Sequence, residues 1–147
     1  MLTRNQKFAL AVYDKVVKVG DKYPTEKDSA LKDKYQKQRN KYGAMAQKLP
    51  LLIRTAGLAQ AIGFLEAKSE KASEEPNLLL LKDLSEVIEV EMKLDGKFPD
   101  KCRNAEMTEY LRLTQNTLAA LLWFKRYSVS VLDVEENARG EENENEN

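Results

Sequence analysis

Residues 44–65 read AMAQKLPLLIRTAGLAQAIGFL, and no other segment of the chain constrains the backbone as strongly. The segment is apolar and rich in small residues, but Pro50, Gly57 and Gly63 interrupt it. A proline inside a helix removes one hydrogen bond and clashes with the preceding turn. We therefore expect one helix to end near Leu49 and a new helix to begin at Pro50. We also expect the two glycines to let a neighbouring backbone approach closely.

Apolar residues recur at helical spacing on both sides of this segment, and they predict an all-α fold. Thr3 and Gln6 form a capping-box pattern, and Gly20 occupies the position of a C-terminal cap. The expected helices are 4–19, a second helix capped by Thr25 or Asp28, 50–56, 58–70, a fifth helix capped by Asn77, and 105–132 capped by Asn104. The expected loops are 70–76 and 95–103. We predict a single compact helical bundle of about five to six helices over residues 1–132.

The last predicted helix carries a continuous apolar stripe. The stripe consists of Leu111, Leu118, Leu121, Leu122, Val129 and Leu132. Trp123, Phe124 and Tyr127 lie beside it, where aromatic side chains are more typical of a core than of a base-stacking platform. Leu31 is likewise expected on the buried face of the second helix.

Composition excludes several kinds of catalytic site. The 147 residues include no histidine and one cysteine, Cys102, so histidine acid–base catalysis and an intrachain disulfide are excluded. Zinc would lack its usual ligands and the single thiol has no partner base, so we expect no catalytic residue, metal or cofactor. The sequence shows neither a signal-peptide pattern nor an apolar run of ~18 residues. We therefore expect a cytoplasmic protein with no membrane partner.

Charge is distributed unevenly, although the net charge is zero. Residues 133–147 contain seven acidic residues and one basic residue, and we expect this acidic tail to be disordered. The rest of the chain contains 23 basic and 17 acidic residues, a net charge of +6. Residues 1–54 alone contain 13 basic and 5 acidic residues, a net charge of +8. This asymmetry favours a polyanionic partner.

Basic residues of the second helix form the clearest candidate binding surface. At the rotation of a regular helix, four of its lysines fall within about 60° of one another. They are Lys34, Lys37, Lys41 and Lys48, which lie beside the apolar stripe of this helix, while Lys32 and Arg39 flank the other edge of that apolar stripe and Arg54 follows in the broken segment. Lys125 and Arg126 add two cations on the last helix. Such a basic stripe matches the phosphates of a nucleic-acid backbone, but it is also typical of a solvated lysine face.

Two Glu-x-x-Glu pairs offer an alternative chemistry. They are Glu86 with Glu89 and Glu106 with Glu109. On adjacent helices, such pairs can bind magnesium in helical nucleotide pyrophosphatases, because the ion prefers hard oxygen ligands. Glutamates three residues apart are also ordinary on a charged helix surface. A magnesium-dependent nucleotide hydrolase is therefore a less favoured alternative.

Two segments together carry a resemblance to a known family. The first has LPLLI at residues 49–53, followed by Gly57-Leu58 and Phe64-Leu65. The second has YLRLT at residues 110–114 and LLWFKRY at residues 121–127. With the chain length and helix order, this pattern resembles the small subunit of the type III-B CRISPR effector, the fifth protein of the Cmr complex. The resemblance covers roughly residues 3–130, and the acidic tail lies outside it.

The resemblance implies a non-catalytic structural subunit of a ribonucleoprotein complex in antiviral defence. Such subunits stack as an inner filament and contact the backbone and large polymerase-like subunits, beside the guide RNA and target RNA. The resemblance assigns RNA-backbone contacts to the basic residues Lys37, Lys41, Lys48, Arg54, Lys125 and Arg126. It assigns architectural roles to Pro50, Gly57 and Leu58. A helical adaptor that binds only protein, with lysines that serve solubility, is the main alternative.

Overall fold

The computed structural model describes residues 1–25, 30–71, 73 and 75–136. Within these residues it contains six α-helices and no strand, so the predicted all-α fold is confirmed. The helices are α1 (Arg4–Lys22), α2 (Lys32–Ala56), α3 (Leu58–Ser69), α4 (Glu75–Glu91), α5 (Phe98–Asn104) and α6 (Met107–Ser130). None of these helices is long and apolar enough to cross a membrane.

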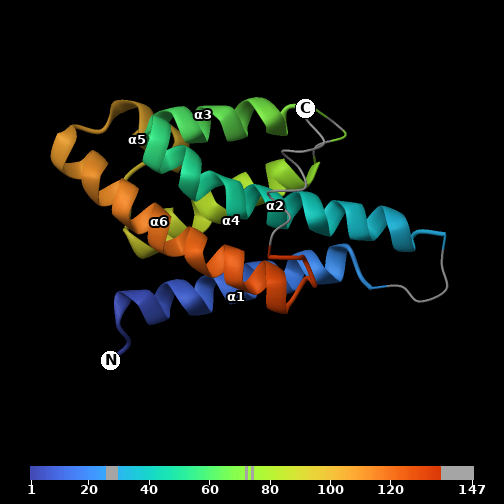
Figure 1. The fold of residues 1–147 in the computed structure, drawn as a ribbon. Helices are drawn as coiled ribbons and strands as arrows, with labels where there is room; N and C mark the ends of the chain where they lie inside the picture. Colours follow the sequence, from blue (N-terminus) through green and yellow to red (C-terminus); the bar gives the residue numbers. More distant parts are fainter. Residues whose placement is uncertain (26–29, 72, 74, 137–147) are drawn as a thin grey trace.

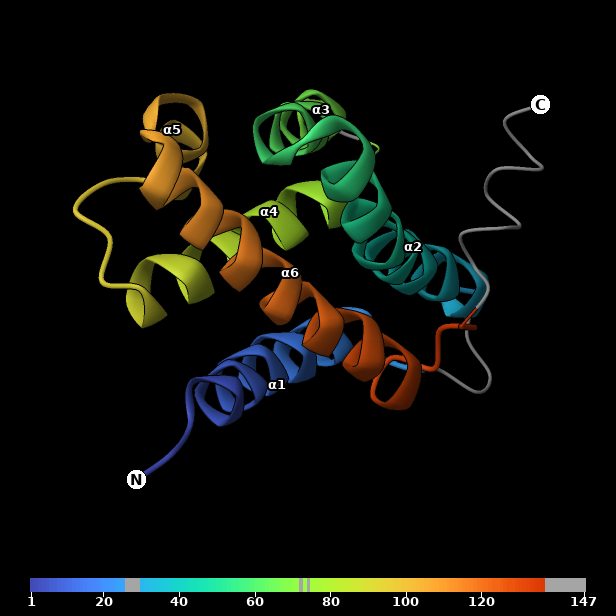
Figure 2. The same ribbon diagram turned by 60° about the vertical axis from the view of Figure 1, so that its left-hand side comes forward.

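Helix α6 packs against both α1 and α2 (Figure 1). Figure 2 shows it crossing the molecule from α5 toward the C-terminal end of α1. Helix α4 packs against α1, α2 and α3, and α3 and α5 form the edge opposite α1. The chain therefore brings its first and last helices side by side.

The core lies where α1, α2, α4 and α6 meet. The apolar residues that recur at helical spacing in the sequence form buried faces, because Val12 and Val16 in α1 and Leu84 and Ile88 in α4 are fully buried. Leu31, in contrast, is 44% exposed. The prediction that it lies on the buried face is wrong, since α2 begins only at the next residue.

Helix α2 continues through Pro50, so the predicted break at this residue is wrong. Leu49 and Ile53 flank the proline and are 0% and 3% exposed. A proline in a helix interior costs about 3 kcal/mol, whereas burial of one large aliphatic side chain contributes about 1.5–3 kcal/mol. Packing on both sides of Pro50 therefore offsets the lost hydrogen bond, and the helix remains continuous.

The glycines of this region act differently from one another. Gly57 has φ +92°, and this left-handed conformation ends α2 and starts α3 in a new direction. A Cβ on Gly57 would lie 3.2 Å from the Tyr110 hydroxyl, while a Cβ on Gly63 would meet nothing within 4 Å. The expected approach of a neighbouring backbone is therefore wrong. The closest contact is at Gly43, where a Cβ would lie 2.6 Å from Cγ1 of Val134.

The capping box at the start of α1 is confirmed. The Gln6 backbone N–H donates to Thr3 Oγ1 at 3.1 Å, and the Thr3 N–H donates to Gln6 Oε1 at 2.8 Å. The predicted end of the helix is wrong, since α1 continues past Gly20 to Lys22 and the N–H of Tyr23 still donates to Val19 O. The side chain of Tyr23 is 5% exposed, so packing favours the extra turn.

Two further predicted caps are wrong. Helix α2 has Leu31 as its N-cap, so Thr25 does not cap it, and Asp28 lies outside the described residues. Helix α4 starts at Glu75, and Asn77 lies within its first turn, 3% exposed. Pro76 occupies a position in that first turn that tolerates proline, so the helix can begin before the residue that resembles a cap.

A short helix, α5, occupies the predicted loop 95–103. It begins where the Phe98 N–H donates to Oε2 of Glu89 on α4 at 2.8 Å, and the Phe98 side chain is fully buried. Asn104 is the last residue of α5, and Glu106 is the N-cap of α6. The prediction that Asn104 caps the last helix is therefore wrong.

The chain packs beyond the end of α6. Leu132 and Val134 are 1% and 2% exposed, and Gln47 Nε2 of α2 donates to the Glu135 carbonyl at 3.0 Å. The Val134 N–H donates to the Ser128 carbonyl at 3.1 Å. Packing thus extends into the first residues of the expected acidic tail, whose residues 137–147 lie outside the described part of the chain.

Candidate nucleic-acid interface

Two of the predicted contact residues lie on the N-terminal half of α2. Lys37 is exposed, and Lys41, one turn further on, is half-buried. The Lys41 ammonium donates to the Ser73 carbonyl at 3.0 Å, which joins α2 to the segment before α4. Lys41 therefore already supports the fold, while Lys37 projects from the surface.

Lys48 points toward α3 rather than outward from the stripe. Its ammonium lies 5.1 Å from the centroid of the Phe64 ring, and the ammonium of Lys68 lies 5.6 Å from the same ring. A cation over an aromatic ring is attracted by the negative ring face. The geometry gives Lys48 a packing contact of its own and separates it from Lys37.

Arg39 lies in sequence across the apolar stripe from the four lysines, and the structure buries it at 4% exposure. Its guanidinium donates to the carbonyls of Leu132 at 3.1 Å, Tyr23 at 2.8 Å and Pro24 at 3.1 Å, and to Gln36 Oε1 at 2.6 Å. The five donors of arginine suit such a junction of several backbone acceptors. Arg39 thus fastens the end of α1 and the segment after α6 to α2.

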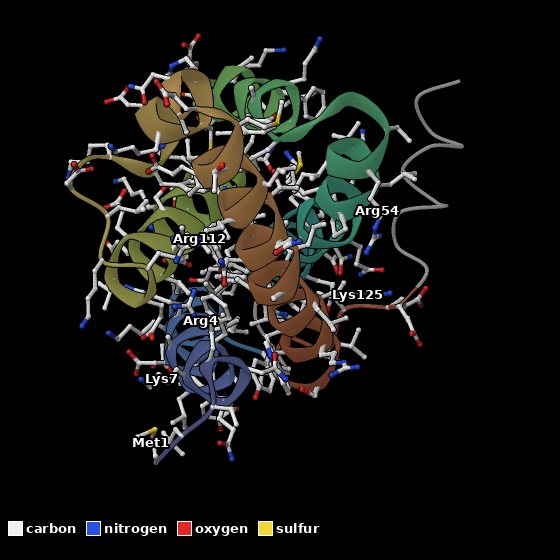
Figure 3. All side chains as sticks on the ribbon, turned by 90° about the vertical axis from the view of Figure 1, so that its left-hand side faces the viewer. Met1, Arg4, Lys7, Arg54, Arg112 and Lys125 are labelled. Carbon is white, nitrogen blue, oxygen red and sulfur yellow. The ribbon has the colours of Figure 1, made fainter. Side chains whose placement is uncertain are left out.

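A second basic surface covers the side of the molecule that carries α6 (Figure 3). We call it the α6 basic face, and it consists of Arg4, Lys7, Arg54, Arg112 and Lys125. Arg4 Nη1 donates to Oδ1 of Asn116 on α6 at 3.1 Å, which places the start of α1 on this face. Within the described residues none of the five cations forms an ion pair.

The six predicted contact residues therefore do not form one surface. Arg54 and Lys125 lie on the α6 basic face, whereas Lys48 faces α3. Arg4, Lys7 and Arg112 were not predicted. The packing of α1 against α6 brings them together across more than one hundred residues of sequence, and no local pattern signals that pairing.

Arg126 belongs to an aromatic cluster between α1 and α6. Its guanidinium lies 5.2 Å from the Trp123 ring, which stacks on Tyr127 at 5.5 Å, and Tyr127 meets Tyr13 edge-on at 5.3 Å. Trp123 Nε1 donates to Asn5 Oδ1 at 3.0 Å. The rings are engaged with one another, which favours a packing role for the cluster.

Among the aromatics of this segment, Phe124 is fully buried, as predicted, while Trp123 is half-buried. The apolar stripe predicted on the last helix is only partly buried. Leu111, Leu122 and Val129 are 53%, 42% and 37% exposed. Helices α1, α2 and α4 pack against α6, and these apolar residues lie on its uncovered outer side.

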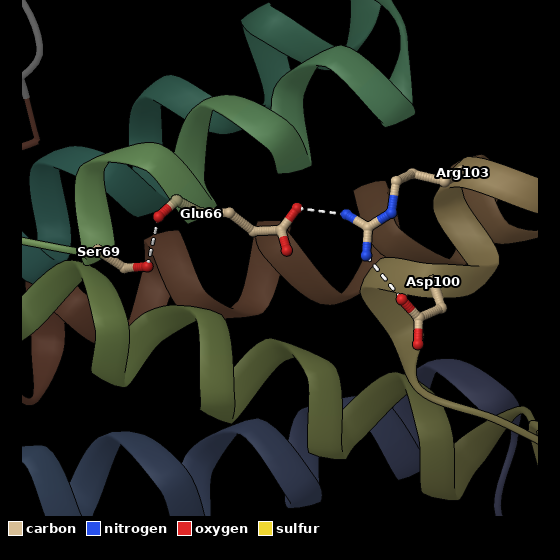
Figure 4. Close-up of polar contacts among 4 residues, drawn as sticks. All are labelled: Glu66, Ser69, Asp100 and Arg103. Carbon is tan, nitrogen blue, oxygen red and sulfur yellow. Dashed lines mark hydrogen bonds and ion pairs between the residues drawn. The ribbon is translucent and has the colours of Figure 1, made fainter.

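Other basic residues are neutralised at the opposite edge of the bundle. Arg103 on α5 pairs with Oε1 of Glu66 on α3 at 2.7 Å and with Oδ1 of Asp100 at 2.6 Å (Figure 4). Ser69 Oγ donates to the Glu66 carbonyl at 2.8 Å. These contacts join α3 to α5 and leave the positive charge of Arg103 compensated.

Three of the four glutamates of the magnesium alternative are engaged with separate partners. Glu86 pairs with Lys15, which lowers the pKa of the carboxyl, and Glu89 accepts the Phe98 N–H. Glu109 lies 3.9 Å from the Lys101 ammonium. Across the described ranges, no group of three or more acidic or cysteine side chains is arranged to hold a metal ion.

Two ionisable groups with large pKa shifts, Asp83 and Cys102, lie in the interior. Tyr42 donates its hydroxyl to Asp83 Oδ2 at 2.8 Å, and burial raises the pKa of Asp83 to about 6. Burial also raises the pKa of the Cys102 thiol to about 12, and this side chain is 2% exposed. A thiol in this state is a poor nucleophile.

Comparison with known proteins places this fold in one family. The family model for "CRISPR-associated protein (Cas_Cmr5)" matches residues 4–131. The Cmr subunit Cmr5 of the CRISPR system of Thermus thermophilus is 33% identical over 138 residues, which cover 90% of this chain and 99% of the relative. The crystal structure of a Cmr5 family protein from the same organism matches with a TM-score of 0.64 and 31% identity, over 90% of this chain and 99% of that one. The chain therefore belongs to the Cmr5 family of CRISPR-associated proteins.

Proposed function

We propose that this protein is a non-catalytic structural subunit of a type III-B CRISPR ribonucleoprotein effector, the Cmr complex. The observation that carries the proposal is the match to the Cmr5 family over residues 4–131, together with 33% identity to a Cmr subunit. Its partners would be the backbone and large polymerase-like subunits and further copies of this chain. The three glutamates that already have partners and the buried thiol of Cys102 agree with a structural role.

Within the complex, the protein would contact the backbone of guide RNA and target RNA. Exposed cations without ion-pair partners support this role, because they can neutralise phosphates and release counterions. Arg54 and Lys125 would act with Arg4, Lys7 and Arg112 on the α6 basic face. The other contacts predicted from sequence are Lys37, Lys41, Lys48 and Arg126. Phosphate contacts position a nucleic acid without reading its bases, so sequence recognition would be left to base pairing.

The direct test is purification of the tagged protein from its native host, with identification of the RNA and proteins that accompany it. Recovery of guide RNA with other effector subunits would support the proposal, and recovery of the protein without either would contradict it. The RNA contact is tested with Arg54→Glu/Lys125→Glu in the assembled complex. Retention of target RNA should fall steeply and in a salt-dependent way, while Lys97→Glu at the start of α5 serves as the matched control.

A helical adaptor that binds only protein is the second candidate function. The exposed Leu111, Leu122 and Val129 on α6 favour it, since apolar side chains on a helix surface commonly meet another protein. Partner binding that survives both RNase treatment and high salt would support the adaptor. Loss of the partners after RNase treatment would support the RNA-dependent assembly.

A further inference from the structure

We propose that the acidic segment 137–147 docks on the α6 basic face, at the junction of α2 and α6 where Arg54 and Lys125 lie. The structure fixes the point from which this segment departs. Val134 packs against Gly43 of α2, and the Glu135 carbonyl accepts from Gln47 Nε2 at 3.0 Å. The Val134 N–H donates to the carbonyl of Ser128 on α6 at 3.1 Å. The residues just before this segment are thus held to both α2 and α6.

The proposed docking site lies within easy reach of that point. Arg54 follows Gln47 by two turns on the same side of α2, a rise of about 10 Å. Lys125 precedes Ser128 by about one turn of α6, and Figure 3 shows Lys125 on the side where the chain leaves this helix. Eleven residues span at most about 36–40 Å, so the segment can cover both cations.

The charge of segment 137–147 is opposite to that of the proposed docking site. The segment contains Glu141, Glu142, Glu144 and Glu146 against the single base Arg139, a net charge of −3. Within the described residues, Arg54 and Lys125 make no ion pair of their own. A short tether holds the acidic groups at an effective concentration in the millimolar range, so weak individual contacts suffice. The segment also lies beyond residue 131, where the family match ends, so it adds charge to a shared helical domain.

The docked segment would compete with RNA phosphates for the same cations. This consequence, unlike the docking itself, rests on the proposed RNA contact. The free protein would bind RNA weakly at low salt, and a high local density of phosphates in the assembled complex would displace the segment. The carboxylates would thereby restrict RNA binding to the correct assembly.

Docking is tested directly on the full chain with a spin label at Asn147→Cys, since the native Cys102 is buried. At about 50 mM NaCl, the label should broaden the amide signals around Arg54 and Lys125 and spare those around Lys97, and at about 0.5 M NaCl the effect should disappear. The localised broadening should be absent in the four-fold variant Glu141→Gln/Glu142→Gln/Glu144→Gln/Glu146→Gln. The matched control is Asn143→Gln/Asn145→Gln, which keeps the four charges and should keep the broadening. Uniform broadening, or broadening that survives removal of the four charges, would overturn the proposal.

RNA competition is tested by fluorescence anisotropy with a labelled single-stranded RNA. The four-fold Glu→Gln variant should bind roughly three to ten times more tightly than the wild type at low salt, the range that one or two exposed ion pairs can supply. The difference should vanish at high salt. If neither protein binds RNA but the localised broadening persists, docking stands and the RNA contact fails. Equal affinities without localised broadening would overturn docking and leave the RNA contact intact.

Discussion

Replacement of Asp83 by asparagine is expected to change how the stability of the protein depends on pH. Asp83 lies on α4, 8% exposed, and accepts the Tyr42 hydroxyl at 2.8 Å. Asparagine retains an acceptor for that hydrogen bond and carries no charge to desolvate. Lys15, Lys18 and Glu86 are the charged groups whose fields reach the carboxyl.

The magnitude follows from the shift in pKa. Burial raises the pKa of Asp83 from 3.8 to about 6, and Tyr42 opposes part of this rise by donating to the carboxylate. A shift of about two units corresponds to ~3 kcal/mol. Because the folded protein holds this proton more tightly, the contribution to stability is fully present below pH 3.8 and is lost as the pH rises through about 6. The free energy of unfolding of Asp83→Asn, relative to wild type, should thus rise by about 2–2.5 kcal/mol between pH about 4 and pH about 7.5, since part of the contribution is already lost at pH 4.

Urea unfolding followed by circular dichroism at a series of pH values measures this difference. Asp14→Asn is the control, because Asp14 is an exposed carboxylate on α1 with 68% of its side chain accessible. Its profile should run parallel to that of the wild type. If the Asp83→Asn profile is also parallel to that of the wild type, burial does not raise the pKa of Asp83, and the prediction is wrong. The absolute cost of the substitution does not affect this test, since only the change with pH is compared.

Three further substitutions test the packing. Gly43→Ala should lower the free energy of unfolding by about 1–3 kcal/mol, because its Cβ would overlap Val134. A second substitution, Val134→Ala, should restore part of this loss. An unchanged melting temperature for Gly43→Ala would refute the contact. Arg39→Met should cost about 2–4 kcal/mol in urea unfolding, since several buried carbonyls lose their donor; a neutral result would contradict its fastening role. Gly57→Ala should cost about 1–2 kcal/mol for its left-handed backbone, whereas Gly63→Ala should stabilise by about 0.4–1 kcal/mol; equal melting temperatures would refute the distinction.

Most of the helices could be predicted from the sequence because their buried residues recur every three or four positions. The capping box at Thr3 and the stripe around Leu84 are local patterns, and both are present in the structure. The break predicted at Pro50 is absent, because the penalty for proline is local while the burial of Leu49 and Ile53 that offsets it comes from neighbouring helices. Local sequence rules alone do not show whether the proline penalty or the stabilisation from burial is larger.

The candidate site was harder to predict than the fold. The lysines of α2 share a face in sequence, but tertiary contacts draw Lys41 to Ser73 and Lys48 to Phe64. Arg39, in contrast, is buried because three carbonyls from distant segments converge on it. The α6 basic face depends on the pairing of α1 with α6, which is a property of the folded chain and not of either helix.

The pairing of α1 with α6 also determines when the protein can finish folding during its synthesis. The apolar face of α1, which includes Phe8 and Val12, is covered by α6 and α4. Arg39 likewise finds one of its acceptors at the carbonyl of Leu132. At about 5–20 residues per second, a ribosome needs roughly 5–20 s to proceed from α1 to the end of α6. During that interval the nascent chain presents the face of α1 that α6 later covers.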